Sequence, residues 1–131
     1  MNRPNTTMKR ALTYLTTVFL LNSCISSSKG WQGSSYKNST HAEFKELNGK
    51  QSFKLTVPND DTYLKYRISV NRGELKAVIK SNSKYILDKT ITELEDGSAS
   101  VVNQKGTEYT FYVDGLHASG SFDIRFTSDS K

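Results

Sequence analysis

Cys24 is the only cysteine in the 131-residue chain, and its thiol is the one side chain here that is suited to covalent modification. It lies directly after an apolar segment and shortly before a run of serines. A chain with one cysteine forms no internal disulfide, so the stability of its folded part must come from core packing. The residues around this thiol therefore decide which chemistry is expected.

The segment that leads to Cys24 has the pattern of a secretory signal peptide. Met8-Lys9-Arg10 forms a short basic head, and the eleven mostly apolar residues 11–21 follow it. Eleven residues are too few for a membrane span, which needs roughly 20 apolar residues. We therefore expect residues 1–23 to be an export signal, with small Ser23 at the cleavage position.

The tetrapeptide Leu21-Asn22-Ser23-Cys24 resembles the lipobox of bacterial lipoproteins. The resemblance implies cleavage between Ser23 and Cys24, a diacylglycerol thioether on the Cys24 sulfur, and often acylation of the new amino group. It also implies a lipid-anchored protein of the bacterial cell envelope, outside the cytoplasm. Asn22 departs from the family, because it is larger and more polar than the residue usually found there. The alternatives are a plain signal peptide with a chance cysteine, or a core cysteine of a cytosolic protein.

Charge argues against nucleic acid as a partner. The net charge of +5 includes Arg3, Lys9 and Arg10, all within the predicted signal. Residues 24–131 keep 15 basic and 13 acidic groups, a net charge of +2. Such a balanced chain lacks the strongly basic character that binding to nucleic acid requires.

Catalytic and metal-binding patterns are weak. The two histidines, His41 and His117, have no Cys, Asp or Glu neighbours at metal-ligand spacing, so we expect both at the surface. Asp60-Asp61 could offer oxygen ligands to calcium, but a calcium loop needs more carboxylates at fixed spacing, and turn formation explains the pair better. The sequence predicts no catalytic residue, no metal site and no cofactor.

One set of polar and aromatic residues is a candidate ligand face. Alternation along the predicted strands places Tyr63, Lys65, Arg67 and Tyr112 on the outside of the sheet. Aromatic rings beside cations can stack on sugar rings or dock a partner protein. The alternative is that these residues only stabilise a solvated sheet through cross-strand pairs.

The elements that carry these residues are β-strands. From His41 onward apolar and polar residues alternate with period two, as in Phe53, Leu55 and Val57, and turn residues interrupt the alternation about every ten positions. We predict an all-β domain at residues 41–131, an antiparallel two-sheet β-sandwich of seven or eight strands. Hairpin turns are expected at residues 71–73 and 82–83, and a loop at residues 114–120. Residues 92–97 should form a helical turn or a long connection.

Residues 24–40 are rich in serine, glycine and asparagine, which is typical of a flexible tether. Roughly 16 such residues would span on the order of 20 to 24 Å. Trp31 and Tyr36 interrupt the polar run. They should rest at a membrane interface or pack on the domain as a first partial strand.

The order of strands between Phe44 and Phe126 carries a second resemblance. It includes the stretch from Val70 to Leu75, the tyrosine-rich strand from Glu108 to Val113 and a closing segment from Ala118 to Ile124. These are similar to small β-sandwich domains of bacterial lipoproteins, and distantly to prepeptidase C-terminal domains of jelly-roll or immunoglobulin-like fold. The resemblance implies a binding or accessory module without catalysis.

Three classes of function follow from the sequence. The favoured one is a lipid-anchored, non-catalytic binding or accessory module, with the membrane and an envelope protein or glycan as partners. The second is an envelope inhibitor or immunity-type protein with a specific protein partner. The third is an enzyme, for which the sequence offers no cluster of titratable residues.

Overall fold

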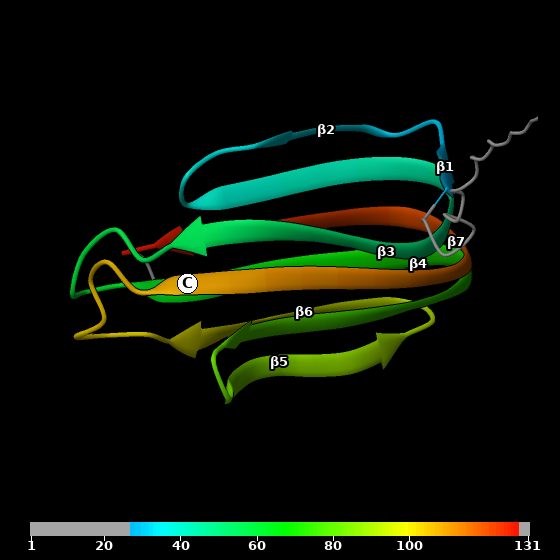
Figure 1. Ribbon diagram of the computed structural model, residues 1–131. Coiled ribbons are helices and arrows are strands. Elements are labelled where there is room, and N and C mark those ends of the chain that lie inside the picture. Colours follow the sequence, from blue (N-terminus) through cyan, green and yellow to red (C-terminus); the bar gives the residue numbers. More distant parts are fainter. Residues whose placement is uncertain (1–26, 129–131) are drawn as a thin grey trace, which may run out of the picture.

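Residues 27–128 are described by a computed structural model, and they form an all-β domain (Figure 1). The predicted signal peptide, its cleavage position Ser23 and the lipidation residue Cys24 lie outside the described residues. Within residues 27–128, no helix has the length and apolar character that a membrane span requires.

Seven strands form one antiparallel network. Their bounds are β1 Ser27–Lys29, β2 Gln32–Ser35, β3 Ser39–Thr56, β4 Tyr63–Ser81, β5 Lys84–Ile91, β6 Leu94–Ser100 and β7 Glu108–Thr127. The hydrogen-bonded order is β1-β3-β7-β4-β5, with β2 added to β3 and β6 added to β4. The predicted antiparallel fold and number of strands are therefore confirmed.

Three strands are long enough to belong to both layers of the sandwich. β3, β4 and β7 contain 18, 19 and 20 residues, and β3 and β4 contain register shifts near their middles. At a β-bulge a strand bends and its twist increases, so a long strand can turn from one layer into the other. Figure 1 shows these strands turning back at one end of the molecule, which we call the bent end.

The two layers are defined by the halves of the long strands. The front layer, nearer the viewer in Figure 1, contains residues 47–56, 72–81 and 108–116 with β5. The back layer contains residues 39–44, 63–70 and 118–127 with β2 and β6. The inward side chains of both layers form the core. Leu55, Ile79 and Phe111 from the front layer and Leu64, Ile68 and Ile124 from the back layer are fully buried.

The predicted tether is wrong for residues 27–40. β1 pairs with Glu46 to Asn48 and β2 with Thr40 to Glu43, so this stretch belongs to the sheet. The cause is Trp31, which stacks on Phe44 and Phe53 with ring centroids 5.6 and 6.1 Å away. Burying a large ring offsets the entropy lost by ordering a serine-rich segment. Of the two aromatic residues in this stretch, Trp31 packs on the domain and Tyr36 remains 62% exposed.

Two further expectations are wrong at the bent end. Residues 71–73 are not a hairpin turn and residues 114–120 are not a loop, because β4 and β7 run through them. Gly73 has φ of 72°, and a Cβ atom there would collide with the carbonyl oxygens of Leu116 and His117. The glycine permits the paired strands β4 and β7 to approach each other closely at the bend. Sequence alone assigns such a glycine to a turn.

The edge strands differ from prediction in two places. Residues 92–97 form neither a helical turn nor a long connection, because β6 begins at Leu94 and pairs with β4. Period-two alternation along residues 85–91 predicts that Tyr85 shares the inward face of Leu87 and Ile91. A register shift between Ile79 and Lys80 places Tyr85 opposite Lys80, and the ring is 53% exposed. The turn predicted at residues 82–83 is confirmed between β4 and β5.

Candidate functional site

The predicted ligand face is divided between the two layers. Tyr63, Lys65 and Arg67 lie on the first half of β4, in the back layer. Tyr112 lies on the first half of β7, in the front layer, where it is opposite Val78 and Ser52. The structure therefore brings the first three together and separates Tyr112 from them. Each of these two surfaces contains a hollow.

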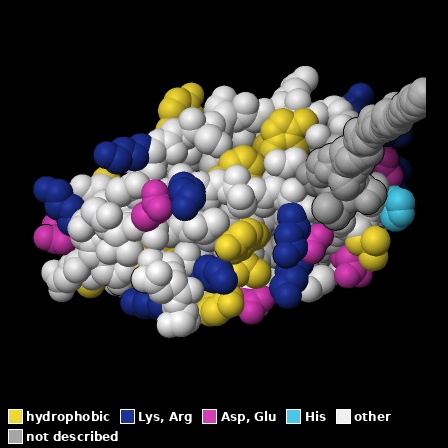
Figure 2. Space-filling model, in the orientation of Figure 1, with side chains coloured by type: hydrophobic (Ala, Val, Ile, Leu, Met, Phe, Trp, Pro, Cys, Tyr) yellow, Lys and Arg dark blue, Asp and Glu magenta, His cyan; other side chains and the backbone are white. Residues whose placement is uncertain are grey.

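The front hollow lies on the outer side of the front layer and has a volume of about 300 Å³. Figure 2 shows this side of the molecule, with hydrophobic side chains next to lysine, arginine and acidic side chains below its centre. The residues of the front hollow are Lys50, Lys76, Val78, Lys80, Tyr85, Asp88, Tyr112 and Asp114.

Two tyrosine rings and one lysine organise the front hollow. Lys80 Nζ lies 5.3 Å from the ring centroid of Tyr85 and 5.6 Å from that of Tyr112. Both distances are within the range of a cation–π interaction. Pairing in the sheet places Val78 beside Tyr112 and Lys80 beside Tyr85, so the side chains of the hollow come from the three strands β7, β4 and β5. Because Tyr85 is more than half exposed, its ring remains available for contacts with a ligand.

The charged groups of the front hollow have no ionic partners within the domain. The ion pairs found among residues 27–128 include none of its lysines and neither of its aspartates. Lys50 and Lys76 flank Asp114 on neighbouring strands without forming an ion pair with it. With three cations and two carboxylates, the hollow has a net charge of +1. It offers hydrogen-bond donors and acceptors together.

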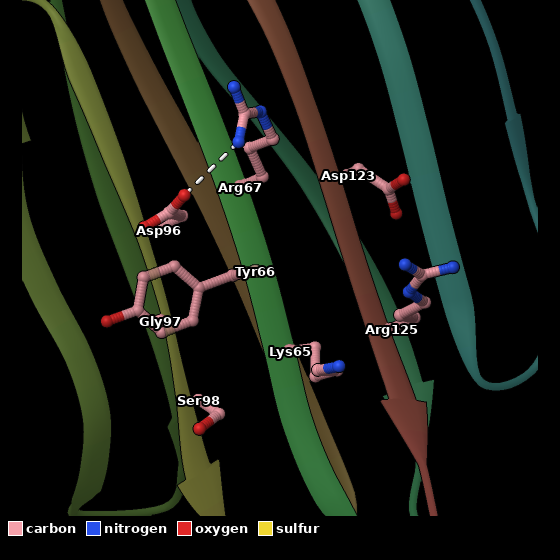
Figure 3. A pocket seen from close by; sticks show the side chains of 8 residues that line it. All are labelled: Lys65, Tyr66, Arg67, Asp96, Gly97, Ser98, Asp123 and Arg125. Atoms are coloured by element: carbon pink, nitrogen blue, oxygen red, sulfur yellow. Dashed lines mark hydrogen bonds and ion pairs between the residues drawn. The ribbon is translucent and has the colours of Figure 1, made fainter. Parts of the chain in front are cut away.

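The back hollow has a different chemistry. It has a volume of about 430 Å³, and Figure 3 shows its side chains: Lys65, Tyr66, Arg67, Asp96, Gly97, Ser98, Asp123 and Arg125. Arg67 on β4 and Asp96 on β6 point toward each other, with 3.2 Å between Nη1 and Oδ2. The ring of Tyr66 reaches toward Gly97, where its hydroxyl occupies the space that a Cβ atom would need.

No exposed aromatic ring lines the back hollow. Tyr66 is partly buried and packs against the core. Arg67 is already paired with Asp96, while Lys65 and Arg125 form no ion pair within residues 27–128. The back hollow can therefore receive polar groups, but it lacks the apolar platform that the front hollow provides.

Charged pairs elsewhere join parts of the sandwich. At the bent end, a hydrogen bond from His117 lowers the pKa of the Glu46 carboxyl below its usual value near 4.5. Between the edge strands β5 and β6, Lys89 Nζ lies 2.6 Å from Glu95 Oε2, and this hydrogen bond raises the pKa of Lys89. Burial raises the pKa of the Tyr109 hydroxyl, which donates a hydrogen bond to Gln104. These contacts are structural, because each joins segments that pack together.

The remaining candidates lie where the residue patterns indicated. His41 and His117 are exposed, and within residues 27–128 no group of three or more His, Cys, Asp or Glu side chains could hold a metal ion. The Asp60 carboxylate accepts a hydrogen bond from the Lys105 backbone N–H, and Asn59 accepts one from the Asp61 N–H. These bonds stabilise the turn, in agreement with the explanation preferred for Asp60-Asp61.

Sequence reasoning found Tyr112 and missed the other members of the front hollow. Lys80 and Val78 lie on a strand whose outward positions were readable from its alternation, so a signal was present. For Tyr85 the alternation predicted an inward side chain, but a β-bulge turns this side chain outward. The assembly of β4, β5 and β7 side chains depends on strand order, which alternation does not reveal.

Comparison with known proteins gives distant structural similarities only. No family model matches the chain, and no curated protein matches it. A solved structure described as "CBM4 structure and function" shares 8% identity over 74% of this chain and 75% of its own, with a TM-score of 0.37. The Drosophila melanogaster CENP-C cupin domain shares 8% identity over 81% and 82%, with a TM-score of 0.38. TmCBM61 in complex with beta-1,4-galactotriose shares 15% over 73% and 64%, with a TM-score of 0.33. Similarities at this level assign no ligand and no activity to the chain.

Proposed function

We propose that this protein is a lipid-anchored, non-catalytic binding module of the bacterial cell envelope. The observation that carries the binding role is the front hollow, where the exposed Tyr85 ring and the Tyr112 ring flank Lys80 on an open sheet face. Exposed aromatic groups beside charged groups without ionic partners are typical of a contact site. The anchor is supported by the lipobox-like tetrapeptide that ends at Cys24.

The structure limits how far the domain can lie from this anchor. Sheet pairing begins at Ser27, three residues after Cys24. Consecutive Cα atoms are 3.8 Å apart, so Ser27 lies at most about 11 Å from Cys24. This replaces the expected 20 to 24 Å tether with a short connection. Because β1 pairs with residues 46–48, the connection joins the bent end, and we place that end toward the lipid surface.

In this proposal the front hollow lies above the membrane. Along β4, Val78 lies six residues beyond Arg72, which adjoins the bend. At about 3.4 Å per residue this separation is roughly 20 Å. The hollow would then lie beyond the lipid headgroups and face sideways, toward other components of the envelope.

The anchor is tested by labelling and fractionation. Cells that produce the full chain are grown with a palmitate analogue, and the protein is followed in membrane and soluble fractions. We expect label on the wild type, a mature N-terminus at Cys24 and recovery with membranes. In the Cys24→Ser variant we expect no label and loss from the membrane fraction. An unlabelled wild type, or a Cys24→Ser variant that stays in the membrane, would contradict the proposal.

A further inference from the structure

We infer that the front hollow binds an anionic saccharide polymer, one whose sugar units bear carboxylate or phosphate groups. This inference rests on the proposed binding function and names the chemical class of the ligand. It is drawn from three properties of the hollow: its aromatic rings, its cations without ionic partners, and its carboxylates.

The rings supply a surface for the apolar face of a sugar. Tyrosine combines a large apolar ring with a polar hydroxyl, so it can contact ring carbons and still bind hydroxyl groups. Tyr85 and Tyr112 lie on different strands with Lys80 between them, and Val78 extends the apolar surface beside Tyr112. A ring-shaped ligand can therefore make contact across the β4, β5 and β7 strands.

The lysines favour a negative charge on that ligand. Lys50, Lys76 and Lys80 surround the rings, and none of the three takes part in an ion pair found among residues 27–128. A carboxylate or phosphate group can approach them without displacing a protein carboxylate. Lys80 contacts both rings, so the cation and the stacking surface act at the same point.

The two carboxylates favour a sugar over a nucleic acid. Asp88 lies opposite Val78, and Asp114 lies between Lys50 and Lys76. Carboxylates accept hydrogen bonds, which sugar hydroxyls donate, but they repel a continuous phosphate backbone. The front hollow has a volume of about 300 Å³, which is at the small end of the range for ligand pockets. An open hollow of that size suits a short stretch of a polymer that crosses the sheet.

The inference is tested by calorimetric titration of the protein purified from the producing cells, in detergent micelles, whether or not it carries a lipid. The probes are alginate, whose sugar units carry carboxylates, phosphorylated dextran, whose sugar units carry phosphates, and neutral dextran. We expect binding to at least one anionic polymer and none to dextran, and the preferred polymer identifies the type of charge. Equal affinity for dextran, or binding to none of the three, would overturn the inference.

Variants locate the site on the front layer. Tyr85→Ala and Lys80→Gln should each weaken binding by about tenfold or more, while Tyr85→Phe, which keeps the ring, should retain most of the affinity. Tyr36→Ala removes an exposed tyrosine outside the hollow and Lys65→Gln removes a back-layer lysine, so both should bind as the wild type does. Circular dichroism confirms that each variant is folded.

Failure of this inference is distinguishable from failure of the anchor. Palmitate labelling reports on Cys24 and does not depend on the front hollow. The polymer titration, compared between the wild type and the front-layer variants, reports on the front hollow. If Tyr85→Ala abolishes capture of one stoichiometric envelope protein while no polymer binds, the ligand class is wrong and the inhibitor or immunity-type function gains support.

Discussion

The two outer faces of this sandwich are built from the same three long strands, yet they differ in chemistry. The front hollow has an exposed tyrosine, a second ring and three lysines that form no ion pair within residues 27–128. In the back hollow Arg67 pairs with Asp96, and the ring of Tyr66 packs against the core. The front face is therefore arranged to contact a ligand, whereas part of the back face is occupied with its own contacts.

The difference comes from the bends in the strands. A strand that passes from one layer to the other displays its first outward residues on one face of the molecule and its last outward residues on the other. β4 displays Lys65 and Arg67 at the back and Lys76 and Lys80 at the front. One alternating sequence can thus supply two independent surfaces, and the bend decides where they separate.

The largest expected effect is a loss of stability when the bend in β4 is altered. Gly73→Ala introduces a Cβ atom at φ of 72° and against two backbone carbonyl oxygens. Left-handed backbone costs an L-residue roughly 1 to 2 kcal/mol, and the collision adds to that cost. We expect a loss of about 2 to 4 kcal/mol in the free energy of unfolding, measured by denaturant titration.

Gly106→Ala is the matched control. Gly106 also has positive φ, at 85°, but a Cβ atom there would meet nothing within 4 Å. We expect only the conformational cost of about 1 to 2 kcal/mol. Equal losses in the two variants would show that close packing at the bend contributes nothing.

The next prediction compares the loss of one tyrosine from each face. Tyr112→Ala removes a ring of the front hollow, and Tyr63→Ala removes a half-buried ring from the back layer. We expect Tyr112→Ala to weaken binding of the preferred anionic polymer by about tenfold, or 1.4 kcal/mol, in calorimetry. Tyr63→Ala should leave binding unchanged. The reverse result would move the ligand to the back face.

A smaller effect concerns the salt dependence of binding. Because Lys76 contributes charge to the front hollow, Lys76→Gln should lower the affinity at low ionic strength and reduce the loss of affinity on adding salt. We expect a change of roughly two- to fivefold, in line with about 0.5 to 1 kcal/mol for an exposed ionic contact. An identical salt dependence in Lys76→Gln and wild type would exclude this lysine from the site.

The ion pair of the back hollow should contribute still less. Arg67 and Asp96 are more than half exposed, with side-chain exposures of 65% and 57%. Exposed ion pairs are worth roughly 0 to 1 kcal/mol. A double-mutant cycle with Arg67→Gln and Asp96→Asn should give a coupling of about 0.5 kcal/mol or less in the free energy of unfolding. A coupling above about 2 kcal/mol would contradict the view that this contact is only a surface pair.

The last prediction concerns pH at the bent end, where the two faces meet. The Glu46 pKa is lowered by the hydrogen bond from His117, so the charged carboxylate is favoured in the folded state. Its contribution to stability is present above its usual value near 4.5 and is lost as the pH falls through the lower, folded-state pKa. His117→Gln should raise the Glu46 pKa in an NMR titration. An unchanged pKa would exclude this hydrogen bond as the cause.

Much of the fold was readable from the sequence. Burial follows the predicted alternation at Leu55 and Val57, because each strand has one face on the core. The bends could not be predicted, since a glycine such as Gly73 gives the same signal in a hairpin turn as inside a bent strand. The first strands were predicted only as an alternative to the tether, because their serines give no alternation and Trp31 marks their contact with the core.

The site was readable only in part. Lys65, Arg67 and Tyr112 are directed outward as predicted, but which layer each occupies depends on the bends. The outward direction of Tyr85 could not be predicted, because it depends on a β-bulge whose position is set by how β4 and β5 pair. Outward direction is a local property of a strand, whereas a shared surface is a property of strand order.

The most direct test of ligand binding at the front hollow is an NMR titration of the ¹⁵N-labelled protein with a short fragment of the anionic saccharide polymer that binds most tightly in calorimetry. We predict amide shift changes that are concentrated at Val78, Lys80, Tyr85 and Tyr112, with Lys65 and Arg125 unchanged. Shift changes concentrated at Lys65 and Arg125, or none at saturating fragment, would contradict the account.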